Sequence, residues 1–331
     1  MRSIKLNVCW LLSLCLSFSA CVKKMEIFPE LPSSPSGGIS SVEVTGVNGS
    51  ELSFCVDLFA IDHFGGFIED LDGNCFSYDN QDGSNITFLG LETRKTPDKG
   101  AYSAQLLFDQ SGSISGTDPG DARIDAGMAF VDIMSGNDEA SIAVFTSGSF
   151  FYDNTLNRLT SFTRDKTLLR EQIEDMRDKE DGGTPLYASI YNLLETIAAE
   201  ANNDNQAIVV FTDGQDTDGG VLISQLIADA KALGIEVYTV GLGSGVSQDI
   251  LATIALGTGG SVMYAQEVTQ LVSLYSSLAE LLRGGYDVYN VCYQVDYPGR
   301  IWQTGEIYQV SLSLTLPTGE IINFPVYLSI P

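Results

Sequence analysis

Helix-like and strand-like patterns alternate in the middle of the chain, whereas its two ends carry strand-like patterns only. Short apolar runs predict buried strands at residues 104–108, 140–145, 207–211, 235–240 and 261–264. Apolar residues at helical spacing predict helices at residues 121–134, 165–177, 185–201, 221–233 and 267–282. Strands that alternate with helices predict an α/β fold in which helices cover both faces of a mostly parallel sheet.

The end segments alternate polar and apolar residues with the period of a β-strand. Residues 39–100 and residues 285–331 each offer about three such strands. Neither segment alone makes a complete β-sandwich, because the edges of its sheet would remain open. We therefore predict that the two segments pair into one β-sandwich and that the α/β domain, residues 101–284, is inserted in it. The alternative is two small, separate β units.

The first residues have the pattern of an export signal. Arg2 and Lys5 precede an apolar run at residues 6–16 that is too short to span a bilayer. Phe18-Ser19-Ala20-Cys21 resembles the lipobox of bacterial lipoproteins, which implies cleavage after residue 20 and acylation of Cys21. The alternative is an ordinary cleaved signal. Residues 21–38, rich in proline, serine and glycine, are predicted to be a lipid anchor and flexible stalk.

The net charge bears on the class of binding partner, and the cysteine content bears on which disulfides can form after export. The formal net charge is -26 at pH 7, which disfavours binding to nucleic acid phosphates. Three cysteines remain beyond the predicted lipid anchor: Cys55, Cys75 and Cys292. After export they allow one disulfide and one free thiol. A bridge between Cys55 and Cys292 and a bridge between Cys55 and Cys75 both remain open.

Oxygen-bearing side chains follow two of the predicted strands and open one of the predicted helices. Asp109, Ser111 and Ser113 form a D-x-S-x-S loop after residues 104–108. Thr184 precedes the helix at residues 185–201, and Asp213 follows the strand at residues 207–211. Ligands of open α/β sheets bind beyond the carboxyl ends of the strands. Hydroxyl and carboxylate oxygens suit Mg²⁺, Mn²⁺ or Ca²⁺.

In order and in element context, these five residues resemble the metal-ion-dependent adhesion site (MIDAS) of von Willebrand factor A (vWA) domains, which integrin I domains share. The resemblance covers about residues 101–283 and implies a doubly wound, Rossmann-like fold with one divalent cation, most simply Mg²⁺. It further implies that Ser111 and Ser113 bind the metal directly, that Thr184 does so in one state, and that Asp109 and Asp213 act mainly through waters and hydrogen bonds. Taken singly, each motif is more often a turn or a helix cap.

A hydrolase is the main enzymatic alternative. Gly112-Ser113-Ile114-Ser115-Gly116 matches G-x-S-x-G, the nucleophile elbow of α/β-hydrolases, with Ser115 as the nucleophile. That fold needs a histidine base later in the chain, whereas the single histidine, His63, lies upstream. We therefore expect no catalysis.

The expected function is metal-dependent binding of a protein or extracellular-matrix ligand at the bacterial cell envelope. The ligand would offer an acidic side chain to the metal, since a site with few direct carboxylates leaves the cation electron-poor. The expected location is the outer membrane or the cell surface, with the lipid as the only membrane contact. A second hypothesis is an envelope scaffold or assembly component whose metal is purely structural.

Overall fold

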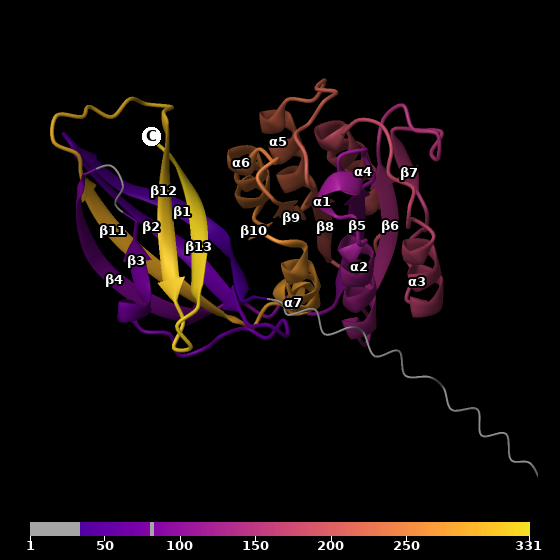
Figure 1. The fold of residues 1–331 in the computed structure, drawn as a ribbon, viewed down its shortest axis with the longest axis horizontal. Coiled ribbons are helices and arrows are strands. Elements are labelled where there is room, and N and C mark those ends of the chain that lie inside the picture. The colour runs from indigo at the N-terminus through magenta and orange to yellow at the C-terminus, as the bar shows by residue number, and fades with distance from the viewer. Residues whose placement is uncertain (1–33, 80–82) are drawn as a thin grey trace, which may run out of the picture. The chain divides into compact units, whose positions relative to one another are not determined.

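The computed structural model describes residues 34–79 and 83–331, which form two β-sheets and a set of helices (Figure 1). The strand order of the larger sheet is β4-β11-β2-β1-β10-β9-β8-β5-β6-β7, and that of the smaller is β13-β12-β3. The predicted export signal and Cys21 lie outside the described residues. Within the described ranges, no helix has the length and apolarity needed to cross a membrane.

Five neighbouring strands of the larger sheet run parallel to one another, as the alternating pattern predicted. They are β10 (Val262–Ala265), β9 (Ile235–Leu242), β8 (Asn205–Thr212), β5 (Tyr102–Asp109) and β6 (Glu139–Phe145). A short antiparallel strand, β7 (Leu156–Arg158), pairs with β6 at the edge. All of β5 and β6 is buried because helices cover both faces of this part of the sheet, which explains their continuous apolar runs.

The helices divide between the two faces of the parallel strands. One group packs together on one face: α2 (Ala122–Ile133), α3 (Lys166–Glu174) and α7 (Leu271–Arg283). The other group packs on the opposite face: α4 (Leu186–Glu200), α5 (Ile223–Leu233) and α6 (Gln248–Thr258). The side chain of Asp165 caps α3, and Gly234, in the left-handed region, ends α5. The α/β fold with a mostly parallel sheet is thus confirmed.

Helix α6 is absent from the elements predicted above. Its signal is present in the sequence, because Ile250, Leu251, Ile254 and Ala255 follow helical spacing after Ser247. Leu251, Ile254 and Ala255 are buried. The final predicted helix also differs, since it begins with a separate 3-10 helix, η2 (Val268–Gln270), before α7.

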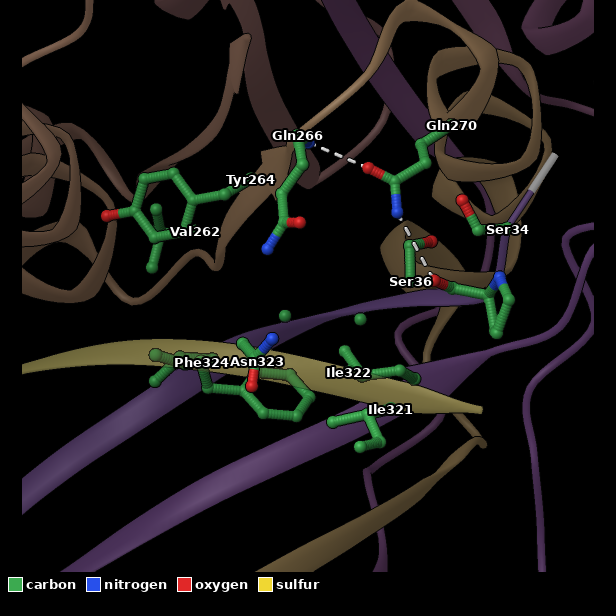
Figure 2. Close-up of a pocket in the computed structure, with 14 residues that line it drawn as sticks. Ser34, Ser36, Val262, Tyr264, Gln266, Gln270, Ile321, Ile322, Asn323 and Phe324 are labelled. Carbon is green, nitrogen blue, oxygen red and sulfur yellow. Dashed lines mark hydrogen bonds between the residues drawn. The ribbon is translucent and has the colours of Figure 1, made fainter. Parts of the chain in front are cut away.

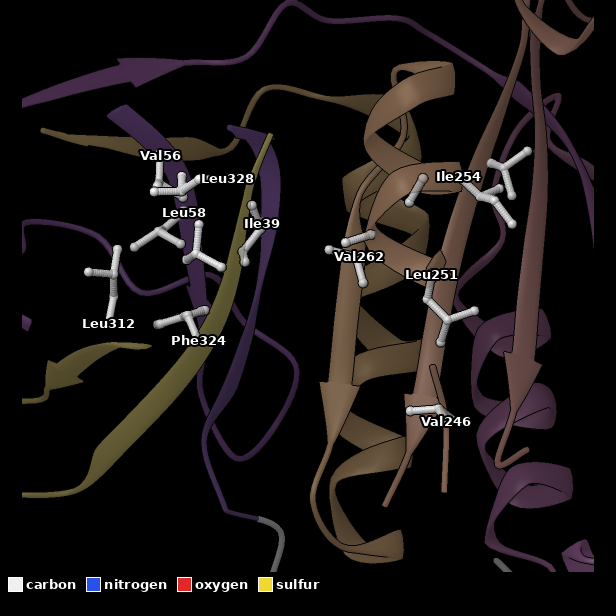
Figure 3. Packing of buried hydrophobic residues seen from close by; sticks show 14 of the residues in the cluster. Ile39, Val56, Leu58, Val246, Leu251, Ile254, Val262, Leu312, Phe324 and Leu328 are labelled. Carbon is white, nitrogen blue, oxygen red and sulfur yellow. The ribbon is translucent and has the colours of Figure 1, made fainter. Parts of the chain in front are cut away.

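The two end segments supply the remaining strands. Those of the first are β1 (Ser36–Asn48), β2 (Glu51–Ile61), β3 (Phe76–Tyr78) and β4 (Asn85–Lys95), and those of the last are β11 (Asp287–Asp296), β12 (Ile307–Thr315) and β13 (Ile321–Ser329). Strand β11 pairs with β2 and β4, and β12 pairs with β3 and β13. The segments therefore pair across the intervening domain. Figure 3 shows buried side chains of β1 and β2, such as Ile39 and Leu58, beside those of β12 and β13.

Strand β1 joins the end-segment strands to the parallel strands. Gly38 and Ile39 pair with Met263 and Val262 of β10, so the ten strands form one continuous sheet. The sequence patterns did not predict this continuity, because each pattern describes one strand and not its neighbours.

The stalk assignment for residues 21–38 is wrong at its end, since β1 already begins at Ser36. Its glycines serve close packing rather than flexibility. A Cβ atom at Gly37 would lie 2.4 Å from the carbonyl oxygen of Phe59, so only glycine allows this approach.

The disulfide joins Cys55 of β2 to Cys292 of β11, which lie directly opposite each other in the antiparallel register. Cys75 is free and half-buried. The structure thus decides between the two pairings that the sequence left open.

Candidate metal site

Asp109 is the last residue of β5 and is fully buried. One carboxylate oxygen accepts a hydrogen bond from the backbone N–H of Ser111 (2.9 Å), and the other accepts one from the hydroxyl of Thr212 (2.6 Å). Burial raises the pKa of Asp109 to about 6, although the hydrogen bonds from Ser111 and Thr212 oppose this rise. A cation beside this carboxylate would stabilise its charged form.

The two serines of the D-x-S-x-S loop turn their hydroxyls toward each other and toward the end of β8. Ser111 Oγ and Ser113 Oγ are 3.1 Å apart, and Ser113 donates a hydrogen bond of 2.7 Å to Oδ1 of Asp213. Thr117 donates to the other carboxylate oxygen of Asp213. Residues from two strand ends thus converge, as their sequence context predicted.

Thr184 and Ser113 both face the backbone of Gly214. A Cβ atom at Gly214 would lie 3.4 Å from Thr184 Oγ1 and 3.7 Å from Ser113 Oγ. Thr184 is nearly buried, yet its hydroxyl makes no hydrogen bond within residues 34–79 and 83–331. The third predicted hydroxyl therefore lies close to the other site residues with its oxygen free to bind a ligand.

The chemistry of these side chains fits a hard divalent cation. Three hydroxyls and two carboxylates surround the carboxyl ends of β5 and β8. Among the described residues no group of three His, Cys, Asp or Glu side chains could hold a metal, so a site built on those ligands alone is not found there. Asp109 and Asp213 are occupied by hydrogen bonds, which fits an indirect role for both carboxylates.

The loop that carries Thr184 is held from two sides. The backbone N–H of Thr184 donates to Thr217 Oγ1 (2.8 Å), and the carboxylate of Asp216 accepts from the N–H of Tyr187 at the start of α4 (3.0 Å). On the other side, Gly183 and Ser147 form a β-bridge. Asp216 and Thr217 were not among the residues predicted for the site, yet they position the third hydroxyl.

A buried arginine, which no sequence motif singled out, lies behind the site. Arg123 of α2 is fully buried and forms ion pairs with Asp118, Asp121 and Glu180. Burial lowers the pKa of Arg123, but the carboxylates of Glu180 and Asp118 more than offset that effect. A lone arginine within an apolar helical pattern is the one signal that could have revealed it, because buried arginine requires ionic partners.

A small pocket of about 90 Å³ lies elsewhere, among β1, β10 and β13 (Figure 2). Gln270 crosses its rim, accepting a hydrogen bond from the N–H of Gln266 and donating one to the carbonyl of Pro35. None of the five predicted metal-site residues lines this pocket.

Several solved structures match parts of this chain at low sequence identity. Proximal thread matrix protein 1 of the mussel byssus matches with a TM-score of 0.47 and 19% identity, over 56% of this chain and 49% of that one. A von Willebrand factor type A protein from Catenulispora acidiphila matches with a TM-score of 0.47 and 12% identity, over 92% of this chain and 75% of that one. The pilus adhesin SpaC of Lactobacillus rhamnosus GG matches with a TM-score of 0.45 and 10% identity, over 87% and 47%. The chain spans about half the length of the mussel protein.

No curated protein matches this sequence. The family model of the von Willebrand factor type A domain matches residues 105–277, which is more than half of the 331 residues. That range contains Asp109, Ser111, Ser113, Thr184 and Asp213. The chain therefore belongs to the von Willebrand factor type A domain family.

Proposed function

We propose that the protein binds one divalent cation through Asp109, Ser111, Ser113, Thr184 and Asp213 and uses it to bind an acidic group of a protein or matrix ligand. Mg²⁺ is the expected cation, with Mn²⁺ and Ca²⁺ as alternatives. Ser111, Ser113 and Thr184 would hold the metal directly. Asp109 and Asp213 would orient the serines and balance the charge. The cation supplies the positive centre that an incoming carboxylate needs.

The convergence of three hydroxyls carries this proposal. Ser111 and Ser113 lie in contact, and Thr184, more than seventy positions later in the chain, reaches the same point beside Gly214. A helix cap would need a hydroxyl bonded to its own helix, but the side chain of Ser113 makes no capping hydrogen bond to α1 (Ile114–Thr117), the short helix that it precedes. Neutral ligands leave the bound cation with most of its charge, which favours an acidic ligand from outside.

The direct test is calorimetric titration of the full chain with MgCl₂, MnCl₂ and CaCl₂. We expect binding of one cation, lost in the double variant Ser111→Ala/Ser113→Ala. Ser115→Ala is the matched control, because Ser115 lies only two residues after Ser113, in α1, but its hydroxyl donates to the carbonyl of Gly112 (2.8 Å). Equal heats from the wild type and the Ser111/Ser113 double variant would refute the metal site.

For location, we propose a lipid-anchored envelope protein acylated at Cys21. Incorporation of a labelled fatty acid, lost in Cys21→Ser, is the test. A structural metal in an envelope scaffold is the alternative to ligand binding. Pull-down from envelope or host extracts separates the two, since capture by a scaffold would survive EDTA.

We also propose that the protein is not an enzyme. Two contacts support this proposal: Ser115 Oγ donates a hydrogen bond to the Gly112 carbonyl, and His63 Nε2 is 3.0 Å from a carboxylate oxygen of Glu320, the residue before β13. Ester hydrolysis that is lost in Ser115→Ala would overturn it.

A further inference from the structure

The loop between β6 and β7 presents two phenyl rings to solvent beside the metal-site loops. Phe150 is 96% exposed and Phe151 is 53% exposed. Exposed single apolar residues are common, but two adjacent aromatic rings at the carboxyl edge of a parallel sheet lie where ligands of such folds bind.

Hydrogen bonds tie this loop to the segment that carries Thr184. Ser147 forms the β-bridge to Gly183, the residue before Thr184. The backbone N–H of Phe150 donates to a carboxylate oxygen of Asp181 (3.0 Å), and that of Phe151 donates to Ser149 Oγ (3.0 Å). The backbone under the rings is therefore fixed, while the rings themselves project outward. Aromatic side chains have few rotatable bonds, so they lose little entropy on binding and are typical interface anchors.

The neighbouring acidic side chains are already bonded within the fold. Asp181 accepts from Phe150, and Asp216 accepts from Tyr187 and from Gly219. Asp218 accepts from the hydroxyls of Ser147 and Thr217. These carboxylates would repel additional acidic groups of a ligand. The rings of Phe150 and Phe151 therefore offer an uncharged surface to the ligand residues that flank the metal-bound carboxylate. Leu222, 74% exposed at the end of the loop that follows Asp213, adds a further apolar group.

We propose that the ligand is a polypeptide segment in which one aspartate or glutamate binds the metal and a large apolar residue close to it in sequence packs on Phe150 and Phe151. This inference rests on the proposed metal-dependent function and specifies its ligand. Burial of an aromatic pair beside a charged anchor adds affinity and also selects among acidic segments.

The test is selection from a displayed library of random peptides of about ten residues on the immobilised full chain in MgCl₂, with elution by EDTA. Phe150→Ser/Phe151→Ser is the test variant. Phe64→Ser is the matched control, because Phe64 is 89% exposed but belongs to the loop between β2 and β3, which holds no metal-site residue. We expect the wild-type and Phe64→Ser pools to be enriched in an acidic residue with an apolar residue within three positions. The test variant should keep the acidic enrichment and lose the apolar one.

Affinity measurements separate the possible failures. The strongest wild-type peptide should bind the Phe150/Phe151 variant about ten-fold more weakly or worse, while calorimetry shows unchanged Mg²⁺ affinity for that variant. An equal peptide affinity, or the same apolar enrichment in both pools, would overturn the role of the rings and leave the metal-dependent function intact. Absence of acidic enrichment from the wild-type pool, in a protein that binds Mg²⁺, would instead overturn the proposed function and this inference with it.

Discussion

Gln110 accepts two hydrogen bonds on its side-chain oxygen from the buried guanidinium of Arg123, at 3.2 Å from Nε and 2.7 Å from Nη2. Gln110 stands between Asp109 and Ser111, and its backbone carbonyl accepts a hydrogen bond from the backbone N–H of Asp181 (2.9 Å). Arg123 also pairs with Glu180. One side chain of α2 therefore holds both the D-x-S-x-S loop and the loop that leads to Thr184.

Replacement of this arginine, Arg123→Met, should lower the free energy of unfolding by about 3–5 kcal/mol. The methionine fills part of the space but leaves the buried Asp118 and the partly buried Glu180 without this counter-charge, and broken buried pairs are costly. Urea unfolding monitored by circular dichroism measures the change.

The matched control is Arg170→Met, because Arg170 pairs with Asp132 where both side chains are partly exposed. Exposed pairs contribute about 0–1 kcal/mol. Similar losses for the two variants would show that Arg123 is not the buried centre of the network.

Gly182→Ala should destabilise the protein by about 2–4 kcal/mol and weaken metal binding. Gly182 has a φ of 87°, and a Cβ atom there would lie 2.2 Å from the carbonyl oxygen of Ser147, so the loop carrying Thr184 must move. The measurement is calorimetric Mg²⁺ affinity together with the unfolding midpoint.

Gly219→Ala is the control that separates the steric clash with Ser147 from the cost of placing an alanine in the left-handed backbone conformation. Gly219 has a φ of 62°, but a Cβ atom there would meet nothing within 4 Å, so only the left-handed conformation opposes the alanine. We expect a loss of about 1 kcal/mol and normal metal affinity. A Gly182→Ala protein that behaves like Gly219→Ala would contradict the close approach to Ser147.

Gly214→Val should abolish cation binding without removing any ligand. The valine methyl groups would enter the space that Thr184 Oγ1 and Ser113 Oγ share, and the cation could no longer reach both oxygens. Gly116→Val is the control, since nothing lies within 4 Å of a Cβ atom at Gly116. Normal Mg²⁺ uptake by the Gly214 variant, measured by calorimetry, would place the cation elsewhere.

Local patterns were enough to predict the parallel sheet and the neighbourhood of the five site residues, because each residue stands at a strand end or a helix start. Local patterns could not predict contacts between residues that are far apart in the sequence. Arg123 meets Glu180 from 57 positions away, and Gly38 meets Met263 of another strand. The glycines of β1 resemble a linker in composition, and only the close approach of Phe59 shows why they are needed.

Removal of the disulfide in Cys55→Ala/Cys292→Ala should lower the free energy of unfolding by about 2–5 kcal/mol. The bridge closes a loop across a sequence separation of 237 residues, and a cross-link over a long loop restricts the unfolded chain strongly. Cys75→Ser, which removes the free thiol, should cost less than about 1 kcal/mol. Urea unfolding with and without reductant measures both variants, and reductant should destabilise the wild type but not the double variant.

The same double variant tests whether the end segments and the metal site are energetically separable. Cys55 and Cys292 join β2 to β11, whereas all five predicted metal-site residues lie within residues 105–277. Distant sites without shared partners contribute additively to stability. Mg²⁺ affinity should therefore be unchanged in Cys55→Ala/Cys292→Ala at temperatures where the protein remains folded. A weaker affinity would mean that strain passes along the continuous sheet, through the pairing of β1 with β10, to the ends of β8 and β5.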